Sequence, residues 1–147
     1  MRHLAVAAIL AVALTGLARA EDVGQIKVAK GTVHVERDGK QLPASAGMPI
    51  RQSDKLITGA DGSAGITFTD NSLLSTGPNS VLVVDQYAFD TRTHVGHFDA
   101  SLKKGSLAVV SGKMVKQTPG AMRVRTPAAI MGVRGTDFVV QVDDPAK

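Results

Sequence analysis

Cysteine is absent from the 147-residue chain, and this absence removes several kinds of chemistry. A chain without thiols has no disulfide bonds, no thiolate zinc site and no cysteine nucleophile. It also has no cysteine after its apolar N-terminal stretch, which excludes a lipoprotein. Any catalysis or metal binding would therefore depend on oxygen and nitrogen side chains alone.

Aromatic residues are nearly as scarce, at 3% of the chain, and tryptophan is missing. Basic residues do not gather into a run anywhere. Proteins that bind nucleic acids stack bases on aromatic side chains beside basic grooves, so this composition argues against a nucleic acid partner. The aromatic side chains are Phe68, Tyr87, Phe89, Phe98 and Phe138.

The first twenty residues, MRHLAVAAILAVALTGLARA, have the order of a cleavable export signal. A basic start precedes an apolar run that is shorter than the roughly 20 residues needed to span a bilayer, and a small-x-small triplet ends at Ala20. We expect cleavage near Ala20 and a location in the periplasm or outside the cell; an uncleaved anchor is the alternative. Loss of the leader lowers the formal net charge from +4 to +2 and leaves residues 21–147, the size of one domain.

Short stretches of alternating apolar and polar residues dominate the rest of the chain, for example TVHVE, AGITFT, MRVRT and FVVQV. Period-two alternation predicts strands with one buried face. Turn dipeptides separate the stretches at a spacing near ten residues, which is typical of a sandwich, a barrel or short solenoid coils. The dipeptides are Asp38-Gly39, Asp61-Gly62, Asp70-Asn71, Pro78-Asn79 and Ser111-Gly112.

Helical periodicity is not found in any ten-residue window after the leader. The stretch TPAAIMG favours one helical turn, with Thr126 as its cap, Pro127 at the first helical position and Gly132 as the left-handed residue that ends it. This turn would carry the chain round a corner before its last strand. The stretch HVGHFDASLKKGS is the most loop-like, and we interpret it as a connection between two groups of strands.

Three segments together resemble a FecR-type domain, an extracytoplasmic module named after ferric-citrate regulators. They are GTVHVERDGKQLPASAGMPI, SDKLITGADGSAGITFTDNSLLSTGPNSVLVV and VRTPAAIMGVRGTDFVVQV, and LKKGSLAVV lies between the last two. The resemblance implies an all-β domain over residues 21–147: a short β-solenoid-like or β-roll stack of short strands, with a β-sandwich as the alternative. It also implies a binding or signalling role without catalysis.

Membrane-bound members of that family carry a cytoplasmic anti-sigma segment and a transmembrane helix before this domain. Here an export leader stands in that place, so the resemblance implies a free-standing exported domain. We expect it to bind a cell-envelope protein or wall polysaccharide without a cofactor. A secreted sensor of small molecules or ions is the first alternative, and a hydrolase is the second.

Catalytic and metal motifs do not emerge from the sequence. The run Gly62-Ser63-Ala64-Gly65 misses the spacing of a serine nucleophile elbow. Turn carboxylates at Asp54, Asp61 and Asp70 favour acceptance of backbone N–H groups over calcium binding, since a calcium β-roll needs a denser glycine-aspartate repeat. Gly59 belongs to the same set of turns. We therefore expect no metal site.

Arg134 is the most prominent single residue, because it stands between glycines in GVRGTD. A guanidinium has five donors in a fixed fork and suits a tie between several acceptors. We predict that Arg134 pins the corner to neighbouring strands, with an acidic partner such as Asp70 and with Thr136 and Asp137 helping to close the corner. An anion held by N–H groups near Gly132 and Gly135 is the alternative.

Overall fold

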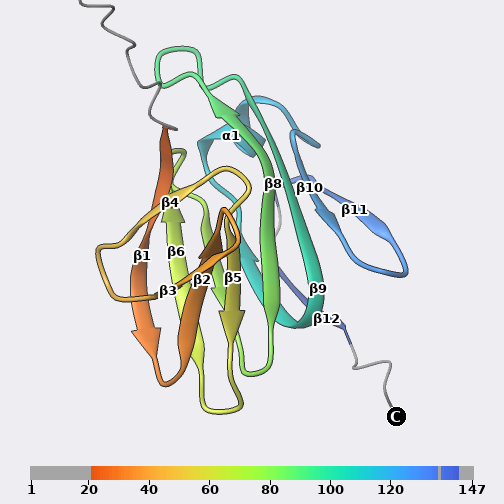
Figure 1. Ribbon diagram of the computed structural model, residues 1–147. Helices are drawn as coiled ribbons and strands as arrows, with labels where there is room; N and C mark the ends of the chain where they lie inside the picture. Colours follow the sequence, from red (N-terminus) through yellow and green to blue (C-terminus); the bar gives the residue numbers. More distant parts are fainter. Residues whose placement is uncertain (1–20, 136, 143–147) are drawn as a thin grey trace, which may run out of the picture.

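Nearly all of the chain that can be described is β-structure (Figure 1). The computed structural model describes residues 21–135 and 137–142, so the predicted export signal in residues 1–20, Thr136 and residues 143–147 lie outside the described residues. The strands are β1 (Asp22–Lys30), β2 (Val33–Arg37), β3 (Lys40–Pro43), β4 (Pro49–Arg51), β5 (Lys55–Thr58), β6 (Ser63–Phe68), β7 (Leu73–Thr76), β8 (Val81–Phe89), β9 (Gly96–Val110), β10 (Met122–Arg125), β11 (Ile130–Val133) and β12 (Phe138–Val142). One five-residue helix, α1 (Lys113–Gln117), follows β9, and within the described part no helix has the length and apolarity to cross a membrane.

The predicted alternation is confirmed where the sequence showed it most clearly. In β2, Val33 and Val35 are buried while His34 between them is partly exposed. In β10, buried Val124 lies between two exposed arginines. Because successive strand side chains point to opposite faces, each strand turns one face toward a common core.

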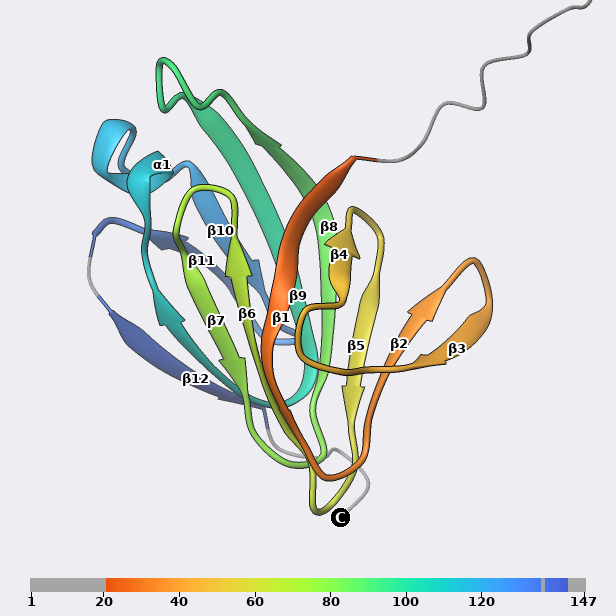
Figure 2. The ribbon, with the colours of Figure 1, turned by 90° about the vertical axis from the view of Figure 1, so that its left-hand side faces the viewer.

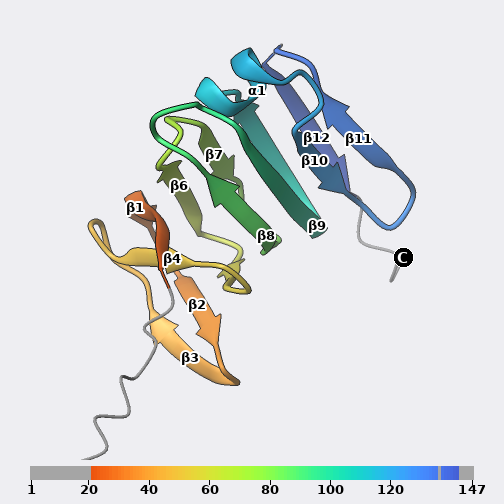
Figure 3. The same ribbon diagram turned by 90° about the horizontal axis from the view of Figure 1, so that it is seen from above.

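The strands form a single curled, open sheet with the shape of a half-barrel. Its main order is β3-β2-β5-β8-β9-β7-β6-β1-β4. β10 and β12 both pair with β9, and β11 pairs with β10. The strands thus make two facing walls, which we call the β8 wall (β2, β3, β5, β8, β10, β11) and the β7 wall (β1, β4, β6, β7, β12) (Figures 2 and 3).

β9 belongs to both walls. Its first part, up to Lys104, pairs with β8 and runs parallel to β10. Its last part, from Gly105, pairs with β7 and β12. The passage between the walls is a sharp bend at the lower end of the molecule (Figure 2).

Gly105 lies at this bend, with a φ of +90°. A Cβ added there would lie 2.1 Å from Ser80 Oγ and 2.5 Å from Ser80 Cα, so only glycine fits. Ser80 also anchors the bend, because its Oγ accepts the N–H of Ser106 and its own N–H donates to Thr58 Oγ1. A short polar chain therefore joins β5, the turn before β8, and β9 where the two walls meet.

The core lies between the walls and is mainly aliphatic. Its aromatic part is a cluster in which the ring of Phe98 lies 4.6 Å from that of Phe68 and 4.9 Å from that of Tyr87. Among the largest buried side chains are Ile26, Ile50, Ile66, Leu74, Leu82, Leu102, Leu107 and Met122. Three of the five aromatic residues of the chain thus pack together in the core.

The all-β prediction is confirmed, whereas neither the solenoid-like stack nor the sandwich is. Stacked coils of a parallel β-helix pair their strands in parallel, but among the described strands the pairing of β9 with β10 is the one parallel pairing. The prediction for HVGHFDASLKKGS is wrong, because most of this stretch is the first part of β9. In β9, the polar residues His97, Asp99 and Ser101 alternate with the apolar residues Phe98, Ala100 and Leu102 and lie on the outer face of the strand.

Candidate functional site

The corner predicted as a helical turn is a β-hairpin. β10 and β11 pair antiparallel from Met122–Val133 to Arg125–Ile130. Thr126, predicted to cap the start of a helical turn, instead closes the hairpin bend, where its Oγ1 accepts the N–H of Ala129 at 3.1 Å and that of Ala128 at 3.3 Å. Two hairpin strands bury one face of the pair, which a single helical turn here would not do.

The two glycines of the corner differ from each other. Gly132 lies within β11 opposite Arg123, and its φ is outside the left-handed region, so the predicted helix-ending role is wrong. Gly135 has a φ of +95° and marks the turn toward β12. Pro127 is exposed in the hairpin bend, and the predicted role of Thr136 falls outside the described residues.

Arg134 is exposed, and it makes no hydrogen bond or ion pair with any residue of the described ranges. Its proposed partner Asp70 is buried elsewhere, where Oδ1 accepts the N–H of Ser72 at 3.0 Å and its hydroxyl at 2.6 Å. Tyr87 Oη lies 3.4 Å from the same oxygen. The prediction of a buried Arg134 tie is therefore wrong.

Asp54, rather than Asp70, is the turn carboxylate that pairs with an arginine, Arg37. Its carboxylate accepts two hydrogen bonds from Arg37, Nε to Oδ1 at 2.9 Å and Nη2 to Oδ2 at 2.6 Å. The N–H of Arg51 also donates to Oδ2 at 2.8 Å. The hydrogen bond to Asp54 raises the pKa of Arg37 above its ordinary value, although desolvation opposes this.

Asp61 accepts the N–H of Thr32 at 3.3 Å, and hydrogen bonding from this threonine lowers the pKa of the exposed carboxyl. Gly62 donates its N–H to Gly59 O at 3.0 Å in the same turn. A Cβ on Gly62 would lie 2.3 Å from Thr32 O, so the close approach requires glycine. Asp54, Asp61 and Asp70 all accept backbone N–H groups, as predicted for turn carboxylates.

The described residues hold no group of three or more His, Asp or Glu side chains suited to a metal ion. Asp54, Asp61 and Asp70 each accept a backbone N–H of a different residue, Arg51, Thr32 and Ser72 respectively, and do not form one shared site.

A polar cluster that the sequence did not reveal lies on the outer face of β8, β9 and β10. We call it the outer cluster; its members are Asp85, Gln86, His97, Asp99, Ser101, Arg123 and Arg125. Register places Asp99 between Gln86 of β8 and Arg123 of β10, and Ser101 next to Arg125. Side chains two apart share a face, so the sheet itself assembles the cluster.

A β-bulge in β8 adds one more carboxylate to this face. The register shifts between Val84 and Gln86, so Asp85 has no Cα partner on β9. Its Oδ2 accepts the hydroxyl of Ser101. Bulges re-aim side chains and are common beside functional sites.

Asp99 occupies the centre of the cluster and is 6% exposed. His97 Nε2 lies 2.9 Å from its Oδ2, and 3.2 Å from the amide oxygen of Gln86. Oδ1 is the one buried side-chain nitrogen or oxygen of the described residues that has no hydrogen-bond partner. The two neighbouring arginines lie beyond hydrogen-bond distance: Arg123 Nε is 3.9 Å from Oδ1, and an Arg125 nitrogen is 4.0 Å from Oδ2.

A pocket of about 300 Å³ opens beside these groups. Its lining is Asp85, Gln86, Asp99, Ser101 and Arg125. The sequence signal for this site was the polar half of the alternation in HFDASL and MRVRT. Their cross-strand neighbourhood depends on the parallel pairing of β9 with β10, which no local pattern specifies.

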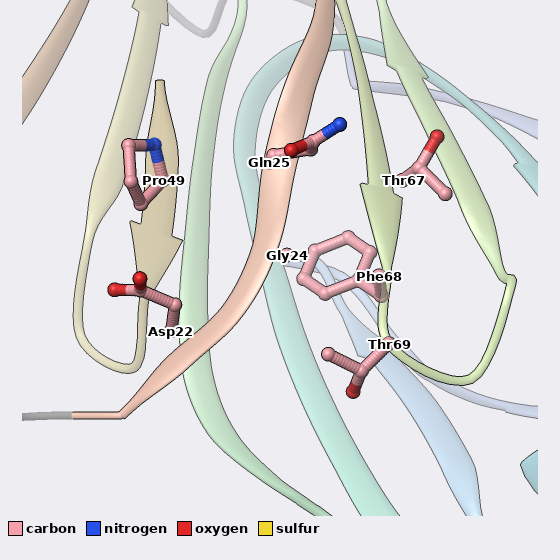
Figure 4. A pocket seen from close by; sticks show the side chains of 7 residues that line it. All are labelled: Asp22, Gly24, Gln25, Pro49, Thr67, Phe68 and Thr69. Carbon is pink, nitrogen blue, oxygen red and sulfur yellow. The ribbon is translucent and has the colours of Figure 1, made fainter. Parts of the chain in front are cut away.

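Two further surfaces stand apart from the outer cluster. Figure 4 shows a pocket of about 340 Å³ over β4, β1 and β6, between Asp22 and Pro49 on one side and Thr67 and Thr69 on the other. A Cβ at Gly24 would lie 2.7 Å from Thr67 O, so glycine is needed where β1 approaches β6.

The other surface is apolar and lies between the edge strands β11 and β12. Val139 is 74% exposed, and Ile130, which is 61% exposed, begins β11 opposite Arg125 of the outer cluster. A pocket of about 540 Å³ lies there, lined by Met131, Gly132, Phe138, Val139, Val140 and Gln141. We call this surface the open edge.

The curled sheet, its structural turns and its open edge define an all-β module. The family described as FecR protein matches residues 54–147, and the chain belongs to the FecR family. The third segment that carried the resemblance and all of the second except its first residue, Ser53, fall in this range, whereas the first segment, residues 31–50, precedes it. No curated protein and no solved structure matches the chain.

Proposed function

We propose that the chain is an exported, non-enzymatic binding module of the cell envelope that receives a strand of a partner protein at its open edge. FecR-family proteins are regulators of envelope signalling, which favours a binding role over catalysis. The export signal in residues 1–20 supports a place in the periplasm or outside the cell.

The open edge carries the proposal. Among the described strands, β11 pairs only with β10 and β12 only with β9, so each has a free row of backbone N–H and C=O groups. Proteins commonly block such edges with charged side chains or proline, but the sequences of β11 (IMGV) and β12 (FVVQV) contain neither. An added strand would pair with this backbone and cover Ile130 and Val139.

The chemistry of the edge favours a protein over wall polysaccharide. Exposed Ile130 and Val139 offer apolar area without hydrogen-bonding groups for sugar hydroxyls. Phe138 is the one aromatic residue in the lining of this edge and is partly buried, and Phe68, Tyr87 and Phe98 lie in the core.

Site-specific crosslinking in the native envelope tests the proposal. A photo-reactive residue at position 139 should capture one protein through one defined segment, because a paired strand holds a fixed register. The same residue at position 95 should not, although Val95 is also 54% exposed. Ile130→Lys should abolish capture by charging the edge, and Val95→Lys should leave it intact.

Equal capture from both positions, capture of glycan alone, or capture that survives Ile130→Lys would each overturn strand addition. The export part is tested separately by N-terminal sequencing of the protein from the envelope fraction. We expect the first residue to be Glu21, and an intact leader on cytoplasmic protein would refute export.

The hydrolase alternative loses support from the outer cluster. Ser101 donates its hydroxyl to Asp85, and His97 faces Asp99 and Gln86, so the described residues contain no serine–histidine hydrogen bond. The small-molecule sensor is favoured by a specific observation, the unpaired carboxylate oxygen of Asp99.

A further inference from the structure

We propose that the outer cluster binds a free amino acid, with the ligand's ammonium between the carboxylates of Asp85 and Asp99 and its carboxylate on the guanidinium of Arg125. This site lies on the outer face of β8, β9 and β10, and it does not depend on strand addition at the open edge.

The state of Asp99 indicates a missing donor. Its carboxylate is buried, and one oxygen accepts nothing. A buried acceptor without a partner costs about 1–3 kcal/mol, and more when it is charged. Nearly all buried polar groups in native structures have partners, and one that lacks a partner calls for an explanation such as a functional role or a bound ion.

The two neighbouring arginines do not remove this cost. Their nitrogens lie 3.9 and 4.0 Å from the Asp99 oxygens, beyond hydrogen-bond length. Arg123 and Arg125 remain about half exposed, at 49% and 45% of the side chain. Both guanidinium groups therefore keep donors available for an outside acceptor.

An ammonium group fits the acidic side of the pocket. It is a compact cation with three donors, enough to serve both carboxylates at once. Asp85 reaches this position only through the bulge in β8, and Ser101 occupies one of its oxygens. The other oxygen of Asp85 remains for a ligand.

A carboxylate fits the basic side. Arg125 lines the same pocket as Asp85 and Asp99. A guanidinium binds a carboxylate through two parallel N–H donors, which fixes orientation as well as adding attraction. Acidic and basic groups side by side in one small pocket match a ligand with both charges.

The size and lining of the pocket narrow the choice of ligand. A volume of about 300 Å³ is at the lower end of small-molecule pockets. Gln86 and Ser101 complete a lining without apolar side chains, so small or polar amino acids should bind better than large apolar ones.

Calorimetry on the mature protein, with each of the common amino acids up to about 1 mM, tests the proposal. We expect at least one small or polar amino acid to bind and to raise the melting temperature with concentration. Its N-acetyl and its C-terminal amide derivatives should each bind at least about tenfold more weakly, since each lacks one charge.

Variants assign the binding to this site. Asp99→Asn should weaken binding of the free amino acid at least about tenfold, and Arg125→Gln should remove the preference for the acid over its amide. Arg92→Gln, in the exposed loop before β9, is the matched control and should bind as the parent does.

Binding of no amino acid, equal binding of the acid and its amide to the parent, or binding unchanged in Arg125→Gln would overturn the proposal. If Asp99→Asn does not fold, the derivative series on the parent and the Arg125→Gln variant still decide the question.

Discussion

Replacing Gly105 by alanine tests the bend at which β9 passes from one wall to the other. The φ of +90° is a conformation that costs an L-residue about 1–2 kcal/mol. The new Cβ would also lie 2.5 Å from Ser80 Cα, a backbone atom that cannot rotate away. Forcing an atom into occupied space typically costs a further ~1–3 kcal/mol.

The two effects together predict a loss of about 2–5 kcal/mol, a large part of the ~5–15 kcal/mol that holds an ordinary domain. Urea denaturation followed by far-ultraviolet circular dichroism measures it. With a slope of about 1–3 kcal/mol per molar urea, the midpoint should fall by at least roughly 0.7 M.

Gly120→Ala is the matched control, because Gly120 has a φ of +87° but nothing within 4 Å of its added Cβ. It should show the conformational cost alone, about 1–2 kcal/mol. If Gly105→Ala destabilises no more than Gly120→Ala, the contact with Ser80 does not constrain the bend and the reasoning fails.

Three further outcomes can be measured on the same protein. Asp54→Asn should lower the free energy of unfolding by about 2–4 kcal/mol in urea denaturation, because it breaks the two hydrogen bonds with Arg37. Asp22→Asn, in an exposed ion pair with Arg51, should lower it by under about 1 kcal/mol, and equal losses in the two variants would contradict this ranking. Burial raises the pKa of Tyr87, the only tyrosine, from 10 to about 12, so absorbance titration should show tyrosinate forming near pH 12 in the folded protein. Because the folded pKa lies above the unfolded value, this contribution to stability is complete below pH 10 and is lost as the pH rises from 10 to 12; a folded-state pKa near 10 would refute it. Arg134→Ala should change stability by no more than about 0.5 kcal/mol, and a loss of 2 kcal/mol or more would restore the buried tie.

Features encoded by neighbouring residues could be predicted from the sequence. Asp38-Gly39 joins β2 to β3 with positive φ at both residues, 53° and 74°, as a tight hairpin turn demands. The hydroxyl of Thr126 bonds only two and three residues ahead, so a local turn role could be anticipated, although the sequence predicted a helical turn where the structure has a hairpin. In each case the cause lies within a few positions of the chain.

Features encoded by distant residues could not be predicted in this way. Asp99 and Ser101 resemble loop residues until Arg123 and Arg125 are placed beside them, and that placement needs the parallel crossover through α1. Arg134 looked like a tie because glycines flank it, but only the packing of other strands decides whether a side chain is buried.

The assignment of β9 to both walls has a consequence for how the domain comes apart. Separating β9 from one wall would also break its pairing with strands of the other wall, so neither wall is expected to fold without the other. Melting should therefore proceed as one cooperative event, and a single backbone cut near Gly105 should disable the whole domain rather than release a stable fragment.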